Sequence, residues 1–234
     1  MEMRWDRSST EEWILTFFEA EKEFMSLFVY PIGDEEAEVR IQDIVSAGTK
    51  KKSAKTQEKI ISKVSRCICE CFLQLWNEGF SEIIIIEDKK SEYAEILDST
   101  PVVDVVYSEY MMEKESESGE TTSSRAGEDF LLFHTEEETI VCKNREETFF
   151  CRLMRHKEEY YLYEVRVEEA VRNRGIAYAC LTELFRRIRG KICLQVGSYN
   201  EPAVHLYQKL GFRITEELCC YAAVEEYFPE DETE

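Results

Sequence analysis

The chain has 234 residues, a length that suits one large domain or two compact ones. Its 44% apolar residues, with 13 Phe and 12 Tyr, suffice for packed cores and exclude a chain that is disordered throughout. The 49 Asp and Glu outnumber the 29 Lys and Arg, giving a formal net charge of −20. Such an acidic surface repels phosphate backbones, which argues against general nucleic-acid binding.

No stretch approaches about 20 uninterrupted apolar residues, and residues 1–5 lack the apolar core of a signal peptide. We therefore expect a soluble, cytoplasmic protein. The nine cysteines are odd in number and lie mostly in apolar runs, so we expect reduced, buried thiols. Cys67, Cys69 and Cys71 have the spacing C-x-C-x-C, but on a helix the middle thiol points away from the other two. We expect no metal site.

The first half of the chain contains both helical and strand patterns. Apolar residues grouped together predict an amphipathic helix over residues 10–23. A stripe of Ile, Val, Phe and Leu at helical spacing predicts a long helix over 55–77, closed by Gly79. The predicted strands cover 24–30, 38–44, 82–86 and 102–111, and a short helix covers 91–97.

Residues 113–128 contain no large apolar side chain and are rich in Ser, Gly, Thr and charge, which predicts a linker or a long exposed loop. Beyond them the predicted strands cover 130–134, 139–143, 148–156, 160–167, 191–196 and 212–223, with helices over 176–189 and 202–210. The order strand, strand, helix, strand, helix, strand thus occurs twice, at an offset of about 110 residues. It favours two similar α/β domains over 1–115 and 128–226, with a linker over 116–127 and an acidic tail over 227–234.

Two motifs in the second half point to a ligand site. Arg172-Asn173-Arg174-Gly175-Ile176-Ala177 forms a turn from a strand into a helix, where small residues let the backbone approach a ligand and helix N–H groups bind phosphate oxygens. The next strand is followed by Asn200, by a helix that contains Ala203 and Tyr207, and by Gly211-Phe212. Taken singly, the first motif also fits a glycine turn with two solvated arginines, and the second fits an aromatic residue that anchors a helix.

Together the motifs resemble the two signatures of the GNAT superfamily of acyl-CoA-dependent N-acetyltransferases. Arg172-x-x-Gly175-x-Ala177 matches R/Q-x-x-G-x-G/A, the pyrophosphate loop, and Asn200-x-x-Ala203-x-x-x-Tyr207-x-x-x-Gly211-Phe212 is similar to the second signature. The resemblance, over residues 130–223, implies an α/β fold with a mixed, splayed central sheet flanked by helices, and two such domains in tandem. Residues 45–54 lack the loop signature, so the first half resembles a degenerate copy that cannot hold a pyrophosphate.

The resemblance also implies an acetyl-CoA site and its residues. The strand before the loop splays from its neighbour, and the pantetheine arm pairs with the backbone of Val165, Arg166 and Val167. The pyrophosphate lies on backbone N–H groups of the loop and the first helical turn, from Arg172, Asn173, Arg174, Gly175, Ile176, Ala177 and Tyr178. Asn200 contacts the cofactor beyond the splay, and Tyr207 faces the sulfur as a general acid. A phenol of pKa about 10 can protonate the departing thiolate only with help from proximity.

A base is needed as well, because a primary amine of pKa about 10.4 is mostly protonated at pH 7. Glu164, in the strand beside the reacting centre, is the first choice. Its rivals are Glu158, Glu159 and His156. The structural alternative for Glu164 is an ion pair with Arg166 or Arg152.

The sequence therefore predicts an acetyl-CoA-dependent N-acetyltransferase that moves an acetyl group to a primary amine. We expect a small-molecule or peptide amine as the acceptor, and the acidic surface favours a cationic one and argues against nucleic acid. Without a long apolar stretch, we expect no membrane partner. One alternative is a non-catalytic acyl-CoA-binding or regulatory module. Another is that the first half serves as an interaction domain that docks a protein substrate. The oligomeric state stays open, with a homodimer among the options.

Overall fold

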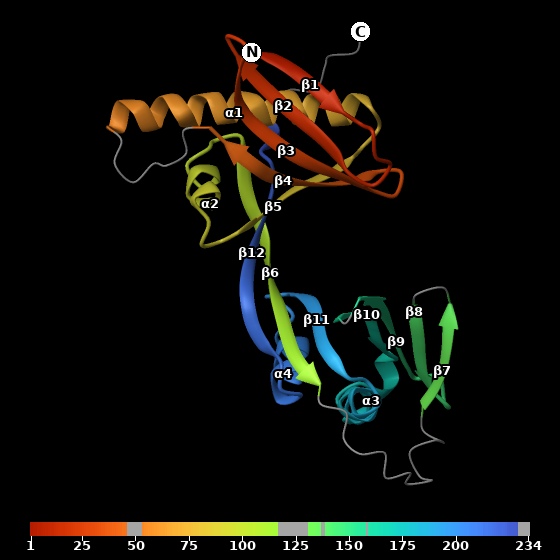
Figure 1. The fold of residues 1–234 in the computed structure, drawn as a ribbon. Helices are drawn as coiled ribbons and strands as arrows, with labels where there is room; N and C mark the ends of the chain where they lie inside the picture. The colour runs from red at the N-terminus through yellow and green to blue at the C-terminus, as the bar shows by residue number, and fades with distance from the viewer. Residues whose placement is uncertain (46–52, 117–130, 137–138, 158, 229–234) are drawn as a thin grey trace. The chain divides into compact units, whose positions relative to one another are not determined.

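A computed structural model describes residues 1–45, 53–116, 131–136, 139–157 and 159–228 (Figure 1). The chain divides into two compact units. Unit 1 comprises Met1–Ser108 together with Glu217–Glu234, and unit 2 comprises Glu109–Glu216. Among the described helices, none combines the length and the apolar character needed to cross a bilayer.

The elements follow one another in the same order twice: four strands, a helix, a strand, a helix and a strand. The first series is β1 (Glu2–Asp6), β2 (Trp13–Glu19), β3 (Lys22–Ile32), β4 (Glu36–Ile44), α1 (Ala54–Asn77), β5 (Glu82–Asp88), α2 (Glu92–Leu97) and β6 (Val103–Ser116). The second series is β7 (Leu131–Glu136), β8 (Thr139–Asn144), β9 (Phe149–His156), β10 (Glu159–Val167), α3 (Ile176–Arg186), β11 (Gly190–Gly197), α4 (Glu201–Lys209) and β12 (Arg213–Ala223).

Unit 1 is built on strands in the order β1-β2-β3-β4-β5-β12. The long helix α1 runs across this sheet (Figure 1) and buries one apolar stripe against it. The stripe consists of Ile60, Val64, Cys67, Ile68, Cys71, Phe72 and Leu75. The predicted long helix is therefore confirmed, and Cys67 and Cys71 are core residues while Cys69 is only half-buried.

The helix predicted over residues 10–23 is wrong, because this segment forms β2 and the start of β3. Leu15 and Phe17 are buried while their neighbours are only partly so, which is strand alternation. Ala20 and Glu21 both have positive φ, at 49° and 64°, and reverse the chain between β2 and β3. Two-residue turns of this kind favour Asn-Gly or Asp-Gly. Because the turn here is Ala-Glu, the sequence does not indicate a hairpin at this position.

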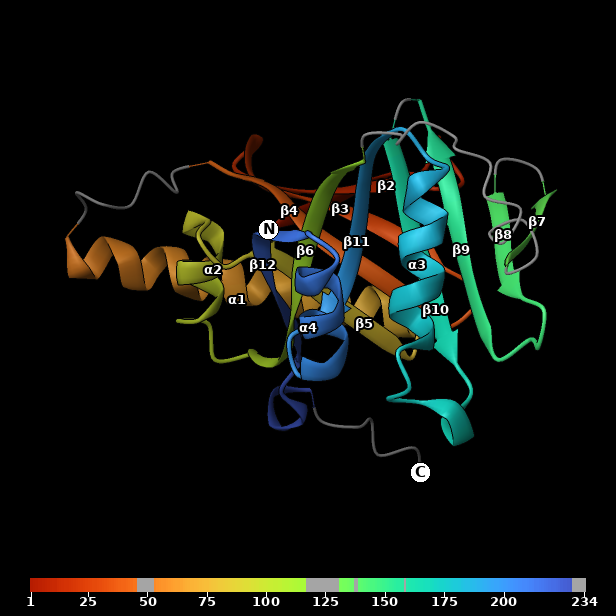
Figure 2. The ribbon, with the colours of Figure 1, turned by 90° about the horizontal axis from the view of Figure 1, so that it is seen from below.

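Unit 2 is built on strands in the order β6-β11-β10-β9-β8-β7. Helices α3 and α4 lie over the same face of β10 and β11 (Figure 2), and their buried residues join a single apolar cluster. The strands contribute every second residue to it, such as Phe149, Cys151 and Leu153 of β9. The intervening residues of β9 point to the opposite face, and α3 and α4 are the only α-helices in the described part of unit 2.

Each unit is completed by a strand segment from the other half of the sequence. In unit 2, Glu109–Ser116 of β6 pairs with all of β11. In unit 1, Leu218–Tyr221 of β12 pairs with Ile85–Asp88 of β5. The predicted boundary at residue 115 falls at the end of β6, and residues 117–127 of the predicted linker and 229–234 of the predicted tail lie outside the described residues. The remaining predicted helices and strands are confirmed, although α3 ends at Arg186 rather than 189.

Candidate functional site

The strands β10 and β11 run parallel but stay paired over only three residues. Their pairing covers Glu159 to Tyr161 of β10 against Lys191 to Cys193 of β11. Beyond this point β10 continues to Val167 and β11 to Gly197 without pairing to each other. Their facing edges therefore offer backbone N–H and C=O groups to an extended ligand. The predicted splay is confirmed, and Val165–Val167 lies in it.

A bulge marks the place where β10 leaves its neighbour. On the β9 side, Tyr163 pairs with Arg152 and Arg166 pairs with Phe150, so β10 carries one extra residue. Glu164 has φ of 50°, a left-handed conformation that costs a non-glycine residue about 1–2 kcal/mol. Strain of this kind persists where the surrounding structure fixes it, often at functional sites.

The bulge also changes which residues of β10 face the helices. Before it, Tyr160 and Leu162 contact the apolar cluster beneath α3 and α4, and after it Val165 and Val167 do so. The extra residue has shifted the alternation by one position. As a result Glu164 and Arg166 lie on the helix-free face, together with Arg152 of β9.

The predicted pyrophosphate loop leads from β10 into α3. Gly175 has φ of 79° and is the N-cap of α3, a conformation that glycine adopts without strain. Asn173 also has positive φ, at 61°, and the Arg172 Nε–H donates back to the Val167 carbonyl at 3.1 Å. The first turn of α3 carries neither an acidic residue nor a side-chain cap. Its leading N–H groups, those of Ile176 to Tyr178, have no partner within the helix and suit an anion.

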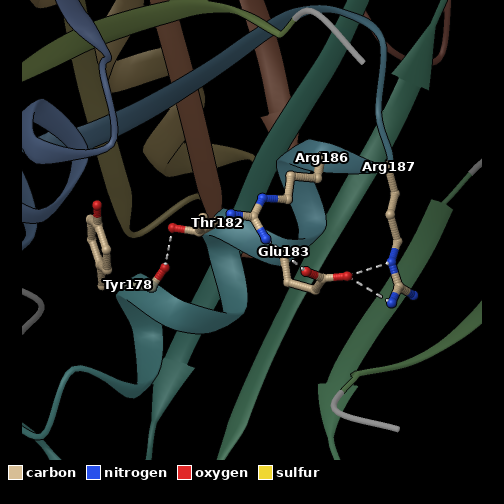
Figure 3. A network of polar contacts seen from close by, with 5 residues as sticks. All are labelled: Tyr178, Thr182, Glu183, Arg186 and Arg187. Atoms are coloured by element: carbon tan, nitrogen blue, oxygen red, sulfur yellow. Dashed lines mark hydrogen bonds and ion pairs between the residues drawn. The ribbon is translucent and has the colours of Figure 1, made fainter. Parts of the chain in front are cut away.

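Side chains of α3 and of its C-cap residue Arg187 form polar contacts along the helix (Figure 3). The Thr182 hydroxyl donates to the Tyr178 carbonyl at 2.7 Å, and the Arg187 guanidinium donates twice to Glu183 at 3.1 and 2.9 Å. Arg186 lies 3.6 Å from the other Glu183 oxygen. The acidic residue of this helix is thus neutralised near its C-terminal end, where basic side chains also complement the helix dipole.

Asn200 and Tyr207 lie at the start and near the end of α4. The Asn200 side-chain oxygen accepts from the Ala203 N–H at 3.3 Å and caps the helix. Tyr207 is buried in the same apolar cluster that receives Val165 of β10 and Val196 of β11. Burial raises the pKa of Tyr207 to about 12, with a smaller contribution from the neighbouring Cys151 thiol. The phenol therefore keeps its proton at neutral pH.

Glu164 lies between two guanidinium groups. Its Oε2 is 3.4 Å from Nε of Arg152 and 3.7 Å from Nη2 of Arg166, so both ion pairs expected as the structural alternative are present. Glu159 instead lies at the paired end of β10, 3.6 Å from Lys191. Glu158 and the side chain of His156 lie outside the described residues. Glu164 is thus the candidate base that the described structure brings to the splay.

From the sequence, Arg152 was expected only as an ion-pair partner of Glu164. In the structure, Arg152 and Glu164 also line the same pocket. The sequence did contain a signal for this position of Arg152. Cys151 and Leu153 face the apolar cluster, and strand alternation therefore places Arg152 on the opposite face of β9. Within the described residues, no group of three or more His, Cys, Asp or Glu side chains is placed to hold a metal ion.

The counterpart of this loop in unit 1 is only partly described. Helix α1 begins at Ala54 after Ser53, which has φ of −65°, so its N-cap is not a left-handed glycine. Residues 46–52 of the segment expected to be degenerate lie outside the described residues.

Comparison with known proteins supports this geometry. Residues 104–212 match the Acetyltransferase (GNAT) family, a match that begins in β6, before the predicted start at residue 128. An uncharacterised N-acetyltransferase of Bacillus subtilis, YdgE, is 36% identical over 63 residues, which are 25% of this chain and 40% of that protein. The chain therefore matches less than half the length of this curated relative.

Solved structures share the fold at low sequence identity. A GCN5-related N-acetyltransferase from Sphaerobacter thermophilus is 12% identical with a TM-score of 0.58, covering 90% of this chain and 79% of that one. A tandem GNAT protein from the clavulanic acid biosynthesis pathway is 10% identical with a TM-score of 0.50, covering 98% and 85%. The predicted α/β fold with a mixed sheet flanked by helices is confirmed, and residues 104–212 are similar to the GNAT family of acetyltransferases.

Proposed function

We propose that this chain transfers the acetyl group of acetyl-CoA to a primary amine. One observation carries the proposal: β10 separates from β11 after Tyr161, and the chain that follows β10 enters α3 at an N-terminus capped by Gly175. A strand edge next to an anion site suits a ligand that has an amide-containing arm and a pyrophosphate.

The residues present fit acetyl-CoA. The backbone of Val165, Arg166 and Val167 would pair with the pantetheine arm, because this part of β10 is unpaired on the β11 side. The N–H groups from Arg172 to Tyr178 would hold the pyrophosphate, since the first turn of α3 has no acid that competes for them. Asn200 uses its side-chain oxygen for the helix cap, which leaves its amide nitrogen to donate to the cofactor.

When bound, acetyl-CoA supplies an activated acyl group in the form of a thioester. Tyr207 is the candidate proton donor to the leaving sulfur, because the phenol is protonated at neutral pH. Its pKa of about 12 makes the proton harder to release, so donation depends on proximity to the developing thiolate. Glu164 is the candidate acceptor for the amine proton. To act in this way it must exchange one of its two arginine contacts for the incoming amine.

The two ion pairs of Glu164 also favour a second candidate function, a non-catalytic acyl-CoA-binding or regulatory module. In that case the carboxylate only holds the bulge in place, and acetyl-CoA binds without being consumed. A primary amine must lose a proton before it attacks, a free-energy cost of about 4–5 kcal/mol at pH 7. A site without a free base would therefore bind the cofactor and turn it over slowly.

One experiment separates the two functions. The full chain is incubated with acetyl-CoA and a panel of amines, thiol release is followed, and acetylated products are identified by mass spectrometry. The proposal predicts amine-dependent thiol release and an N-acetyl product. Tight acetyl-CoA binding with no product from any amine would instead support the regulatory module.

A further inference from the structure

A pocket of about 340 Å³ lies on the helix-free face of unit 2, beside the bulge. Thr148, Phe150 and Arg152 line it from the β9 side, and Glu164, Arg166 and Glu168 line it from the β10 side. If the pantetheine arm pairs with Val165–Val167, as the proposed function has it, Glu164 and Arg166 of the pocket lie in or next to that segment of β10. The pocket is then open to the acceptor from the face opposite α3.

The pocket contains two positive charges in a chain with a net charge of −20. The Arg152 Nε–H is buried and finds no hydrogen-bond acceptor among the described residues, although Oε2 of Glu164 is 3.4 Å away. Its guanidinium lies over the Phe150 ring, 5.7 Å from the centroid, which is within cation–π distance. The Nε–H itself is covered by the protein, so a ligand oxygen would meet the exposed part of this side chain, which is 36% accessible.

Arg166 is available to the same ligand. Its side chain is 72% exposed and its contact with Glu164, at 3.7 Å, is a weak surface ion pair. It can therefore turn toward an incoming anion at little cost. Two guanidinium groups that line one pocket match a carboxylate, which accepts paired N–H donors.

The carboxylates in the pocket would pair with a positively charged group of the ligand. Glu164 and Glu168 both line it, and Glu147, at its edge, is already paired with Lys143. A polycation would meet the carboxylates but also both arginines. A simple amine would compete with both arginines for Glu164 and bring no carboxylate to replace it. A molecule that carries one ammonium and one carboxylate can pair with both the glutamates and the arginines of the pocket.

We propose that this pocket binds the acceptor, and that the acceptor is a free amino acid. Its carboxylate pairs with Arg152 and Arg166, and its amino group lies at Glu164. The inference rests on the proposed function and names its substrate class. It replaces the cationic amine expected from the sequence with an acceptor that carries both an ammonium and a carboxylate.

The transfer balances as follows. The ammonium first loses one proton to Glu164, which passes it on to solvent. The amine nitrogen then forms the N–C bond as the C–S bond breaks, a second proton passes to Glu164, and Tyr207 gives one to the sulfur. Proton return from Glu164 to Tyr207 through solvent restores both residues, leaving an N-acetyl amino acid and coenzyme A with its thiol protonated.

The test uses the full chain with acetyl-CoA and pairs of acceptors: each proteinogenic amino acid beside the amine formed by its decarboxylation. We expect kcat/KM to be at least about 10-fold higher for the preferred amino acid than for its amine. Arg166→Gln should lower kcat/KM for the amino acid about 10- to 100-fold more than for the amine, mainly through KM. Arg155→Gln is the matched control, because Arg155 is an exposed arginine of β9 outside the pocket.

Calorimetry of acetyl-CoA binding to the parent chain and to each variant distinguishes a failure of this inference from a failure of the proposed function. If acetyl-CoA does not bind the parent chain, the proposed function fails. If it binds but no amino acid is acetylated, or the decarboxylated amines react as well as the amino acids, the zwitterion proposal is overturned. Equal losses for both acceptors in Arg166→Gln, with acetyl-CoA affinity unchanged, would overturn it too.

Discussion

The ring of Tyr207 packs edge-on against the ring of Phe212, with 5.8 Å between the ring centroids. The backbone joins the same two residues, because the Phe212 N–H donates to the Tyr207 carbonyl at 3.0 Å. This pair closes the C-terminal end of α4 onto the apolar cluster of unit 2. The packing uses the ring of Tyr207, and its hydroxyl is the part that remains for chemistry.

Replacing Tyr207 with Phe therefore separates packing from catalysis. Tyr207→Phe keeps the ring, so the thermal midpoint should change little, while loss of general-acid assistance should lower kcat about 10²- to 10⁴-fold. Steady-state kinetics and calorimetry with acetyl-CoA measure the two effects, and the acetyl-CoA affinity should stay close to that of the parent. An acyl donor with a more acidic thiol needs less protonation and should lose less rate. A variant as fast as the parent would reduce Tyr207 to a packing residue.

The raised pKa of Tyr207 also predicts a stability change at high pH. The folded chain keeps the phenol protonated to about pH 12, whereas the unfolded chain loses that proton near pH 10. Between these values the unfolded state binds fewer protons, so stability falls as pH rises. Urea unfolding should show Tyr207→Phe gaining about 2 kcal/mol relative to the parent between pH 9 and pH 11.5. A constant difference across that range would mean that the phenol is not buried as described.

The left-handed backbone of Glu164 gives a test of the bulge itself. Glu164→Gly and Glu164→Ala both remove the carboxylate and its two ion pairs. In an ordinary strand alanine is more stable than glycine, but at φ of 50° the order should reverse by about 1 kcal/mol. Comparison of the two variants by urea unfolding isolates the backbone effect. If alanine is the more stable of the two, Glu164 is not in the left-handed region.

Sequence patterns predicted the parts of the site that depend on local conformation. Gly175 was predicted from its motif as a turn residue, and it has the positive φ that the motif requires. Asn200 lies just before the predicted helix, and its side chain caps α4. In both cases the geometry is decided by a few adjacent residues.

The features that sequence could not predict depend on distant partners. The bulge at Glu164 arises because β10 must keep register with β9 while leaving β11, and nothing in Tyr163-Glu164-Val165 signals a positive φ. Similarly, β6 extends to Ser116 through polar residues, because its pairing with β11 rather than its own alternation holds it in a strand. The hairpin at Ala20 and Glu21 uses residues that are unusual for its turn.

The central claim is that the N-terminus of α3 holds the pyrophosphate of acetyl-CoA, and calorimetric titration of Gly175 variants tests it most directly. A Cβ built on Gly175 has no heavy atom within 4 Å, so Gly175→Ala, Gly175→Gln and Gly175→Glu share the strain of positive φ and differ in size and charge. The parent should bind acetyl-CoA, the Ala variant should bind it with a modest loss of affinity, the Gln variant more weakly still, and the Glu variant not at all. Parent-like affinity in Gly175→Glu would contradict the account.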